Sequence, residues 1–109
     1  MRYGIIKAMM QVLKTGEQMQ RHFKGIANHY RIEIILLIFK ERGLTVDQRT
    51  RSLQANFKTI SQHTRYLVQA GLLQKKYQGN WVAHTLSPYG KMFAKFIRDF
   101  QRVGPHAPK

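Results

Sequence analysis

The segment FKTISQHTRYLVQA, residues 57–70, concentrates side chains that can bond to the edges of nucleic-acid bases. Arg and Lys can donate to N7 and O6 of guanine, Gln can bond to N6 and N7 of adenine, and Ser suits either role in the major groove of duplex DNA. A helix at about 100° per residue would gather these polar side chains on one side. They are Lys58, Ser61, Gln62, Arg65 and Gln69.

The opposite side of the same helix is predicted to pack against the protein. Its members fall within about 100° of one another and are Phe57, Ile60, Thr64, Leu67 and Val68. Base edges are usually reached from the N-terminal part of such a helix, which favours Lys58, Thr59, Ser61, Gln62 and Arg65 over Gln69. A merely solvated face would show a similar stripe, but an adjoining basic hairpin and the lack of nearby acid favour binding.

Capping signals divide the chain into short helices that would position this segment. Thr15 and Thr45 each precede a glutamine by three residues, which is capping-box spacing. Asn28, Asn56 and the pair Ser87-Pro88 are further helix starts. The predicted helices cover residues 4–14, 16–27, 28–42, 45–53, 56–71 and 88–102. The third is apolar nearly all round and is predicted to be the buried centre, and the spacing of the fourth and fifth is that of a helix-turn-helix.

Residues 72–86 are predicted to form a β-hairpin that turns at Gly79-Asn80. This turn would pair Leu73 with Leu86, Lys75 with His84 and Tyr77 with Val82. One face, with Leu73, Tyr77, Val82 and Leu86, is expected to pack on the helices. The other face carries Gln74, Lys76, Gln78, Trp81 and Thr85 and would form a basic wing, in which Trp81 is expected to brace the hairpin rather than touch DNA.

The charge balance points to a polyanionic partner, because 19 Lys and Arg against 5 Asp and Glu give a net charge of +14. Nine basic residues and no acidic one lie from Gln48 to Arg98. Positive charge gains most where it displaces counterions from phosphates. The complete predicted set of DNA-contacting residues is Arg49, Arg51, Asn56, Lys58, Thr59, Ser61, Gln62, Arg65, Lys75, Lys76, Gln78 and Asn80.

The last predicted helix has an apolar arc wider than one small core needs, opposite a basic face. Together with the first helix it would supply a two-fold interface. The residues predicted for this interface are Ile5, Ile6, Met9, Met10, Leu13, Tyr89, Met92, Phe93, Phe96, Ile97 and Phe100. The competing interpretation is that this basic amphipathic helix binds an anionic membrane surface.

The stretches FKGIANHYRIEIILLIF, LTVDQRTRSLQANFKTISQHTRYLVQAGLL and KKYQGNWVAHTLS resemble the ArsR-type winged helix-turn-helix transcriptional regulators. The resemblance covers about residues 22–87, and its most specific pieces are ANHYRI, TISQH, QAGLL and GNWV. LSPYGKMF is also similar to MarR-type regulators. The resemblance implies a homodimer on a pseudo-palindromic operator, with the terminal helices forming the subunit contact.

Three positions depart from the family pattern. Arg49 stands where an apolar residue usually packs, Thr64 where leucine is usual, and Gln54 where the turn commonly has glycine. Many family members sense metals through paired cysteines near the reading unit or through His and carboxylate ligands on the last helix. Here the corresponding stretch LTVDQR has no thiol and the last helix offers only Asp99, so neither metal site carries over.

Other site types find little support. The chain has no cysteine, and its five histidines show no ligand spacing, so we expect no metal or cofactor; His63 is expected to be packed and hydrogen-bonded. There is no close acidic pair, glycine-rich phosphate loop or Ser-His-Asp grouping, which argues against an enzyme. No apolar run is long enough to span a bilayer and no cleavage pattern follows the start, so a cytoplasmic protein is expected.

The fold class predicted from these features is mainly α with a small β-hairpin, in one winged helix-turn-helix domain over 1–109. Residues 1–27 and 87–102 would dimerise, 28–86 would form the DNA-binding core with its wing at 72–86, and 103–109 would be a flexible tail. The predicted function is that of a sequence-specific regulator, in particular a repressor, that binds duplex DNA as a homodimer. The open alternatives are a winged helix that binds structured RNA and an adaptor whose aromatic last helix docks another protein.

Overall fold

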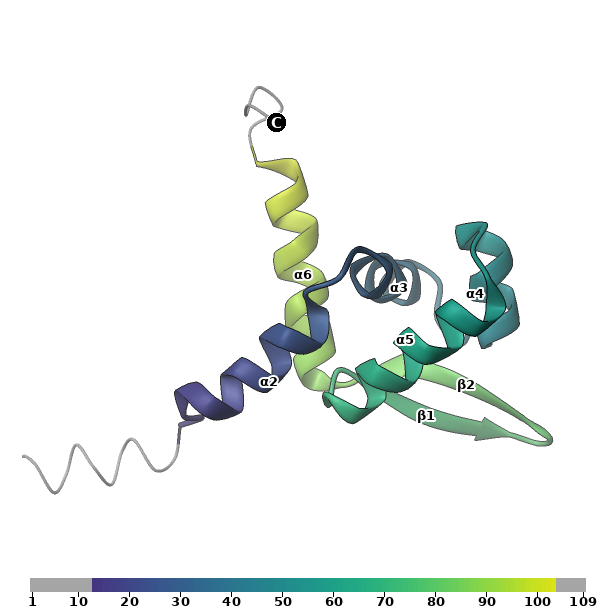
Figure 1. The fold of residues 1–109 in the computed structure, drawn as a ribbon, viewed down its shortest axis with the longest axis horizontal. Helices are drawn as coiled ribbons and strands as arrows, with labels where there is room; N and C mark the ends of the chain where they lie inside the picture. Colours follow the sequence, from purple (N-terminus) through teal and green to yellow (C-terminus); the bar gives the residue numbers. More distant parts are fainter. Residues whose placement is uncertain (1–12, 104–109) are drawn as a thin grey trace, which may run out of the picture.

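The computed structural model describes residues 13–103, which form five helices and one antiparallel hairpin (Figure 1). Their order matches the predicted one. The elements are α2 (Gly16–Ile26), α3 (His29–Lys40), α4 (Val46–Leu53), α5 (Phe57–Gln69), β1 (Leu73–Gln78), β2 (Trp81–Leu86) and α6 (Pro88–Arg102). The predicted helix over 4–14 lies outside the described residues except for its last two, Leu13 and Lys14, which are not helical.

Side-chain caps begin the helices where the sequence predicted them. The Thr45 hydroxyl accepts from the Gln48 amide at 3.2 Å, and the Gln48 side chain accepts from the Thr45 amide at 2.9 Å. Thr15 and Gln18 make the same pair of bonds at the start of α2. Each such cap satisfies amides that a helix start leaves free and contributes about 1 kcal/mol. Short-range chemistry therefore fixes the boundaries of the elements.

Helix α3 is the centre of the hydrophobic core, as its apolar sequence predicted. Ile34, Ile35 and Ile38 on this helix are buried. The helix contacts every other described helix and strand β2, and Figure 1 shows it between α6 on one side and α4 and α5 on the other. The other elements supply the remaining buried residues of this core, which are Ile26, Ile60, Leu67, Ala70, Leu72, Leu73, Leu86 and Ala94.

The start of α6 is held tightly against the chain that follows α5. The Ser87 hydroxyl donates to the Gly71 carbonyl at 2.6 Å and accepts from the Gly90 amide at 3.0 Å. A side chain at Gly90 would collide with the Leu72 carbonyl, so glycine permits this close approach. The end of α5, the base of the hairpin and the start of α6 are thus linked.

The hairpin has the predicted register, with Leu73 opposite Leu86 and Tyr77 opposite Val82. Its predicted apolar face is only partly packed. Leu73 and Leu86 at the base are buried, but Tyr77 is 71% exposed, so the prediction that Tyr77 packs on the helices is wrong. The reason is the length of the hairpin: Tyr77 lies near the turn, and Figure 1 shows the tip of the hairpin extending past the helices.

Candidate nucleic-acid interface

The polar side chains predicted to read bases lie together on the outer side of α5. Lys58, Gln62 and Arg65 are exposed, and Thr59 and Ser61 are half-buried. None of the five makes a side-chain hydrogen bond or ion pair within the described part of the chain. We call these five residues the reading strip. Their donors and acceptors are free to bond to a ligand that lies along the helix.

The inner side of α5 anchors the reading strip through buried contacts. Ile60 and Leu67 are fully buried in the core. Thr64, where the family usually has leucine, is also buried, and its hydroxyl donates to the Ile60 carbonyl at 2.7 Å. This bond satisfies the hydroxyl oxygen that threonine brings into the core in place of leucine. Burying that oxygen without a partner would cost free energy. Phe57, predicted to pack on this side, is largely exposed at the helix start.

Polar contacts from α2 and α3 fix the second half of α5. Nδ1 of His22 donates to the Ala70 carbonyl at 2.7 Å, at the end of α5. Arg31 donates from Nη1 to Nδ1 of His63 at 3.1 Å and lies 4.2 Å from the centre of the Tyr66 ring. His63 is therefore packed and hydrogen-bonded, as predicted. Desolvation first, and then the positive charges of Arg31 and His29, lower its pKa.

The turn between α4 and α5 uses a left-handed residue. Gln54 has φ 52° and ψ 41°, a conformation that glycine adopts most easily, and its amide donates to the Arg51 and Thr50 carbonyls. This glutamine stands where the family commonly has glycine. The helix-turn-helix geometry is therefore kept without a glycine at this position. Asn56 then caps α5 by accepting from the Lys58 and Thr59 amides at 2.7 and 3.3 Å.

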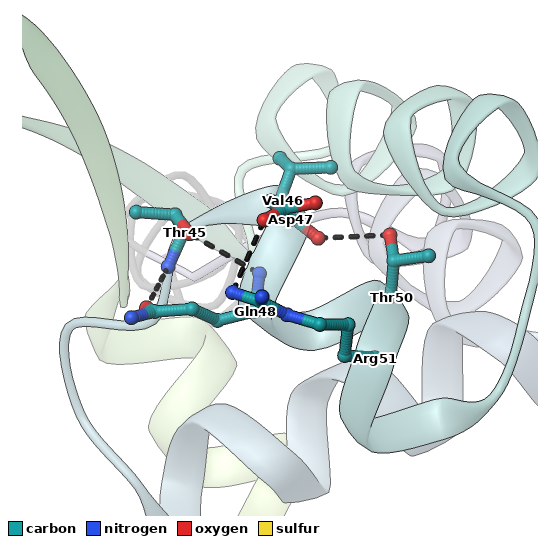
Figure 2. A network of polar contacts seen from close by, with 6 residues as sticks. All are labelled: Thr45, Val46, Asp47, Gln48, Thr50 and Arg51. Carbon is teal, nitrogen blue, oxygen red and sulfur yellow. Dashed lines mark hydrogen bonds and ion pairs between the residues drawn. The ribbon is translucent and has the colours of Figure 1, made fainter.

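Arg51 on α4 is exposed but already has a partner. Figure 2 shows its guanidinium reaching back along the helix to Asp47, and the two groups are 3.1 Å apart. The side chains of both residues are well exposed, so the pair is weak and a phosphate could compete for Arg51. In the same view, the Thr50 hydroxyl donates to the Val46 carbonyl rather than facing solvent.

Arg49 does not belong to the candidate interface. It is 0% exposed, and its guanidinium donates from Nη2 to Nδ1 of His84 at 2.9 Å and from Nη1 to the Leu44 carbonyl. The prediction that Arg49 contacts DNA is therefore wrong. It occupies the inward position that the family usually gives to an apolar residue, and it ties α4 to strand β2 of the wing.

Burial of this basic pair shifts both of its pKa values. Desolvation lowers the pKa of Arg49 to about 10. Desolvation first, and then the charges of Arg49 and Lys75, lower the pKa of His84 to about 4. Since the guanidinium can only donate, Nδ1 of His84 must be the acceptor and the imidazole is neutral at pH 7.

The wing presents its predicted polar residues to solvent. Lys75, Lys76, Gln78 and Asn80 are all exposed. β1 follows α5 directly in the chain and packs against it, as Figure 1 shows, so the wing lies next to the helix that carries the reading strip. Together, α5 and the wing form one basic surface, and the described acidic residue nearest to it in sequence, Asp47, pairs with Arg51.

A second surface, made by α2 and α6, is apolar and exposed. Of the predicted interface residues, Met92, Phe96, Phe100 and Leu13 are largely exposed and Tyr89 is partly so, whereas Phe93 and Ile97 pack against the protein's own core. Ile5, Ile6, Met9 and Met10 lie outside the described residues. The structure adds Met19 and Phe23 from α2, which border a hollow of about 320 Å³ with Met92 and Phe96. We call Met19, Phe23, Met92 and Phe96 the apolar face.

Met19 and Phe23 were not among the residues predicted for the interface, although residues 1–27 as a whole were predicted to dimerise. Their spacing of four residues on an otherwise polar helix is the signal that could have identified them. Among the described residues, no group of three or more His, Cys, Asp or Glu side chains gathers as metal ligands would. Over the same residues, no helix combines the length and apolar character needed to cross a bilayer.

Comparison with known proteins agrees with this geometry. The chain is 36% identical over 66 residues to the arsenic resistance transcriptional regulator ArsR1 of Pseudomonas putida, a match that covers 61% of this chain and 52% of that protein. It is 35% identical over 77 residues to the arsenical resistance operon repressor of Escherichia coli, covering 71% of this chain and 66% of the relative. The matches thus span about half to two thirds of these relatives. No family model matches the chain.

A solved structure extends the comparison to nearly the whole fold. The homodimeric winged helix-turn-helix DNA-binding domain of Mb0332 from Mycobacterium bovis, described as a possible ArsR-family regulator, superposes with a TM-score of 0.67. The superposition covers 94% of each chain at 20% sequence identity and identifies the fold. The sequence matches, the element order and the placement of α5 beside a wing lead to one assignment: the chain belongs to the ArsR-type family of winged helix-turn-helix transcriptional regulators.

Proposed function

We propose that this protein is a cytoplasmic transcriptional repressor that binds a pseudo-palindromic duplex DNA site as a homodimer. The observation that carries the proposal is the reading strip on α5, whose side chains are held outward by Ile60 and Leu67 and flanked by a basic wing. Lys58, Gln62 and Arg65 would bond to base edges in the major groove, while Lys75 and Lys76 would contact phosphates.

The proposed complex places α5 of each subunit in successive major grooves on one side of the duplex, about 34 Å apart. The names of the relatives, a regulator and an operon repressor, support this role. A repressor in this position would act by occluding or organising the promoter. Selection of bound duplexes from a random pool, followed by competition with structured RNA, tests the proposal. We expect recovery of an inverted repeat that RNA does not displace. Preferential binding of RNA would overturn the proposal, because the deep major groove of RNA excludes a helix and α5 could not read bases there.

Base contacts and phosphate contacts should respond differently to mutation. Arg65→Ala or Gln62→Ala is expected to cost about 1 to 3 kcal/mol on the selected duplex and to relax preference at one base position. Lys76→Ala should weaken binding to selected and random duplexes alike, because phosphates carry no sequence information. Fluorescence anisotropy with both duplexes measures these effects. Equal losses on both duplexes for Arg65→Ala would show that this residue does not read bases.

The apolar face supports the proposed homodimer. Met92 and Phe96 project from α6, Phe23 packs edge-on against Phe93 at 5.1 Å between ring centres, and Met19 extends the surface along α2. Such a contiguous exposed apolar surface usually marks an interaction site. A second copy would cover it through a self-complementary two-fold contact. The homodimeric state of Mb0332 is consistent with this proposal.

Phe96→Glu is expected to convert the dimer to a monomer at micromolar concentration, because it places a charge at the centre of the apolar face. Lys95→Gln is the matched control, since it makes the same change in net charge at an exposed position next to Phe96 in α6. Sedimentation velocity distinguishes the two species. A monomeric wild-type protein, or a dimer that withstands Phe96→Glu, would contradict this use of the face.

A further inference from the structure

The sole tryptophan of the chain, Trp81, lies in the wing with 49% of its surface exposed. A tryptophan that only braced the hairpin would be expected to bury most of its ring, because the indole carries a large apolar surface. Trp81 begins β2, directly after the turn, and pairs with Gln78 across the hairpin. Figure 1 shows this end of the hairpin extending past the helices.

Trp81 lies on the face of the hairpin that carries Lys76. Side chains alternate between the two faces of a hairpin, so the register puts Gln78, Lys76 and Gln74 on the same face as Trp81. These three side chains are exposed. Tyr77 is also exposed, but it lies on the opposite face with Lys75 and the buried Leu73 and Leu86. An exposed indole is thus grouped with a cation and two amide side chains.

We propose that Trp81 is a DNA-contacting residue whose indole packs against the sugar edge of the minor groove beside the site read by α5. This inference rests on the proposed function and gives Trp81 a DNA contact in place of the bracing role predicted from the sequence. Lys76 on the same face would hold the adjacent phosphate, and Gln78 would lie toward the groove floor. Apolar side chains in the minor groove commonly pack on sugars or wedge between base steps, with basic and amide side chains beside them.

The same placement gives Trp81 a role in specificity. A wing that inserts an indole senses the width and deformability of the minor groove rather than a base-edge pattern. Preference at the flanking positions of the site would then follow A·T-rich or easily deformed steps. The residues of the reading strip do not reach those positions, so the two preferences are separable by mutation.

Because the chain holds a single tryptophan, its emission reports on the wing alone. The experiment titrates the full-length protein with a duplex recovered from the random pool and measures quenching of the emission by acrylamide, a neutral quencher. The quenching constant is expected to fall about threefold or more on binding. Anisotropy of a labelled copy of the duplex shows independently that the complex has formed.

Trp81→Ala is expected to weaken binding to the selected duplex about tenfold, in the range of aromatic contacts to nucleic acid, and to flatten the preference at flanking positions. Tyr77→Ala is the control, because it removes an aromatic residue that is even more exposed, 71% against 49% for Trp81, from the opposite face of the wing. It should leave both properties nearly unchanged. Thermal unfolding followed by circular dichroism should be the same for both variants, which separates a DNA contact from a brace.

Two results would overturn the inference while leaving the proposed function intact. One is a complex, proven by anisotropy, in which acrylamide quenches Trp81 as freely as before. The other is a Trp81→Ala variant that binds normally or that loses thermal stability in step with affinity. No complex with any duplex in the pool would instead contradict the proposed function itself.

Discussion

Duplex binding is expected to weaken on the order of 10⁴-fold when salt rises from roughly 50 to 200 mM, because the affinity comes largely from counterion release. The structure sets the size of this effect. Of the six basic residues predicted to contact DNA, Arg49 is buried and Arg51 is paired with Asp47. The four that remain per subunit are Lys58, Arg65, Lys75 and Lys76. A cation held in a groove neutralises nearby phosphate charge whether it bonds to a base edge or to a phosphate. Two subunits would therefore neutralise about eight phosphate charges, and each contributes about 0.9 to the logarithmic slope.

Anisotropy titrations at several salt concentrations measure that slope. Lys76→Gln removes two phosphate contacts per dimer and should lower the slope by about 1.8. Lys95→Gln makes the same charge change on α6, away from the basic surface, and should leave the slope nearly unchanged. Arg49→Leu should also leave the slope nearly unchanged, because a buried guanidinium releases no counterion on binding. A flat salt response in the wild type would contradict the phosphate-bound complex.

Most of the fold could be predicted because the signals that set it are local. The caps at Thr15, Asn28, Thr45 and Asn56 act within three residues of the chain and appear as predicted. The hairpin register also follows from one short turn, which fixes every cross-strand pair. The exposed side of α5 follows from helical periodicity alone. These features need no knowledge of what packs against them.

The errors arose where the outcome depends on contacts between distant residues. In the sequence, Arg49 looks like a free cation, because Asp47 is the one acidic residue of α4 and it stands four residues before Arg51, with which it pairs. Its actual partner, His84, is 35 positions away in the wing. Tyr77 was wrongly predicted to be packed, because strand alternation predicts the face on which a side chain lies but not how far the hairpin extends past the helices. Met19 and Phe23 joined the apolar face only once α2 was seen to lie beside α6.

The Arg49–His84 pair has an unusual consequence, because it buries two basic groups together with no carboxylate bonded to either. The pair is stable only while His84 is neutral and accepts from Arg49. Protonation of His84 would remove the acceptor and place two positive charges 2.9 Å apart in the interior. The link between α4 and the wing would then be lost together with the stability of the fold.

The free energy of unfolding is therefore expected to fall by up to about 3 kcal/mol between pH 6.5 and pH 4. His84 has a pKa of about 4 in the folded protein and about 6.5 when unfolded, so in this window the unfolded chain binds a proton that the folded chain does not. The lowered pKa of His63 acts in the same direction. Carboxylates add little background, since the chain has only five acidic residues and Asp47 and Asp99 pair at exposed positions.

Urea unfolding at a series of pH values measures this dependence, and His84→Asn is the variant that isolates its cause. The Asn side chain offers an oxygen near the position of Nδ1, so it can still accept from Arg49, but it does not titrate. Its stability should change much less with pH than that of the wild type over the same window. Superimposable pH profiles for the two proteins would mean that His84 is not the group responsible, and that the acid sensitivity arises elsewhere. A steeper profile in the wild type would identify the neutral His84 as the requirement for keeping the wing joined to α4.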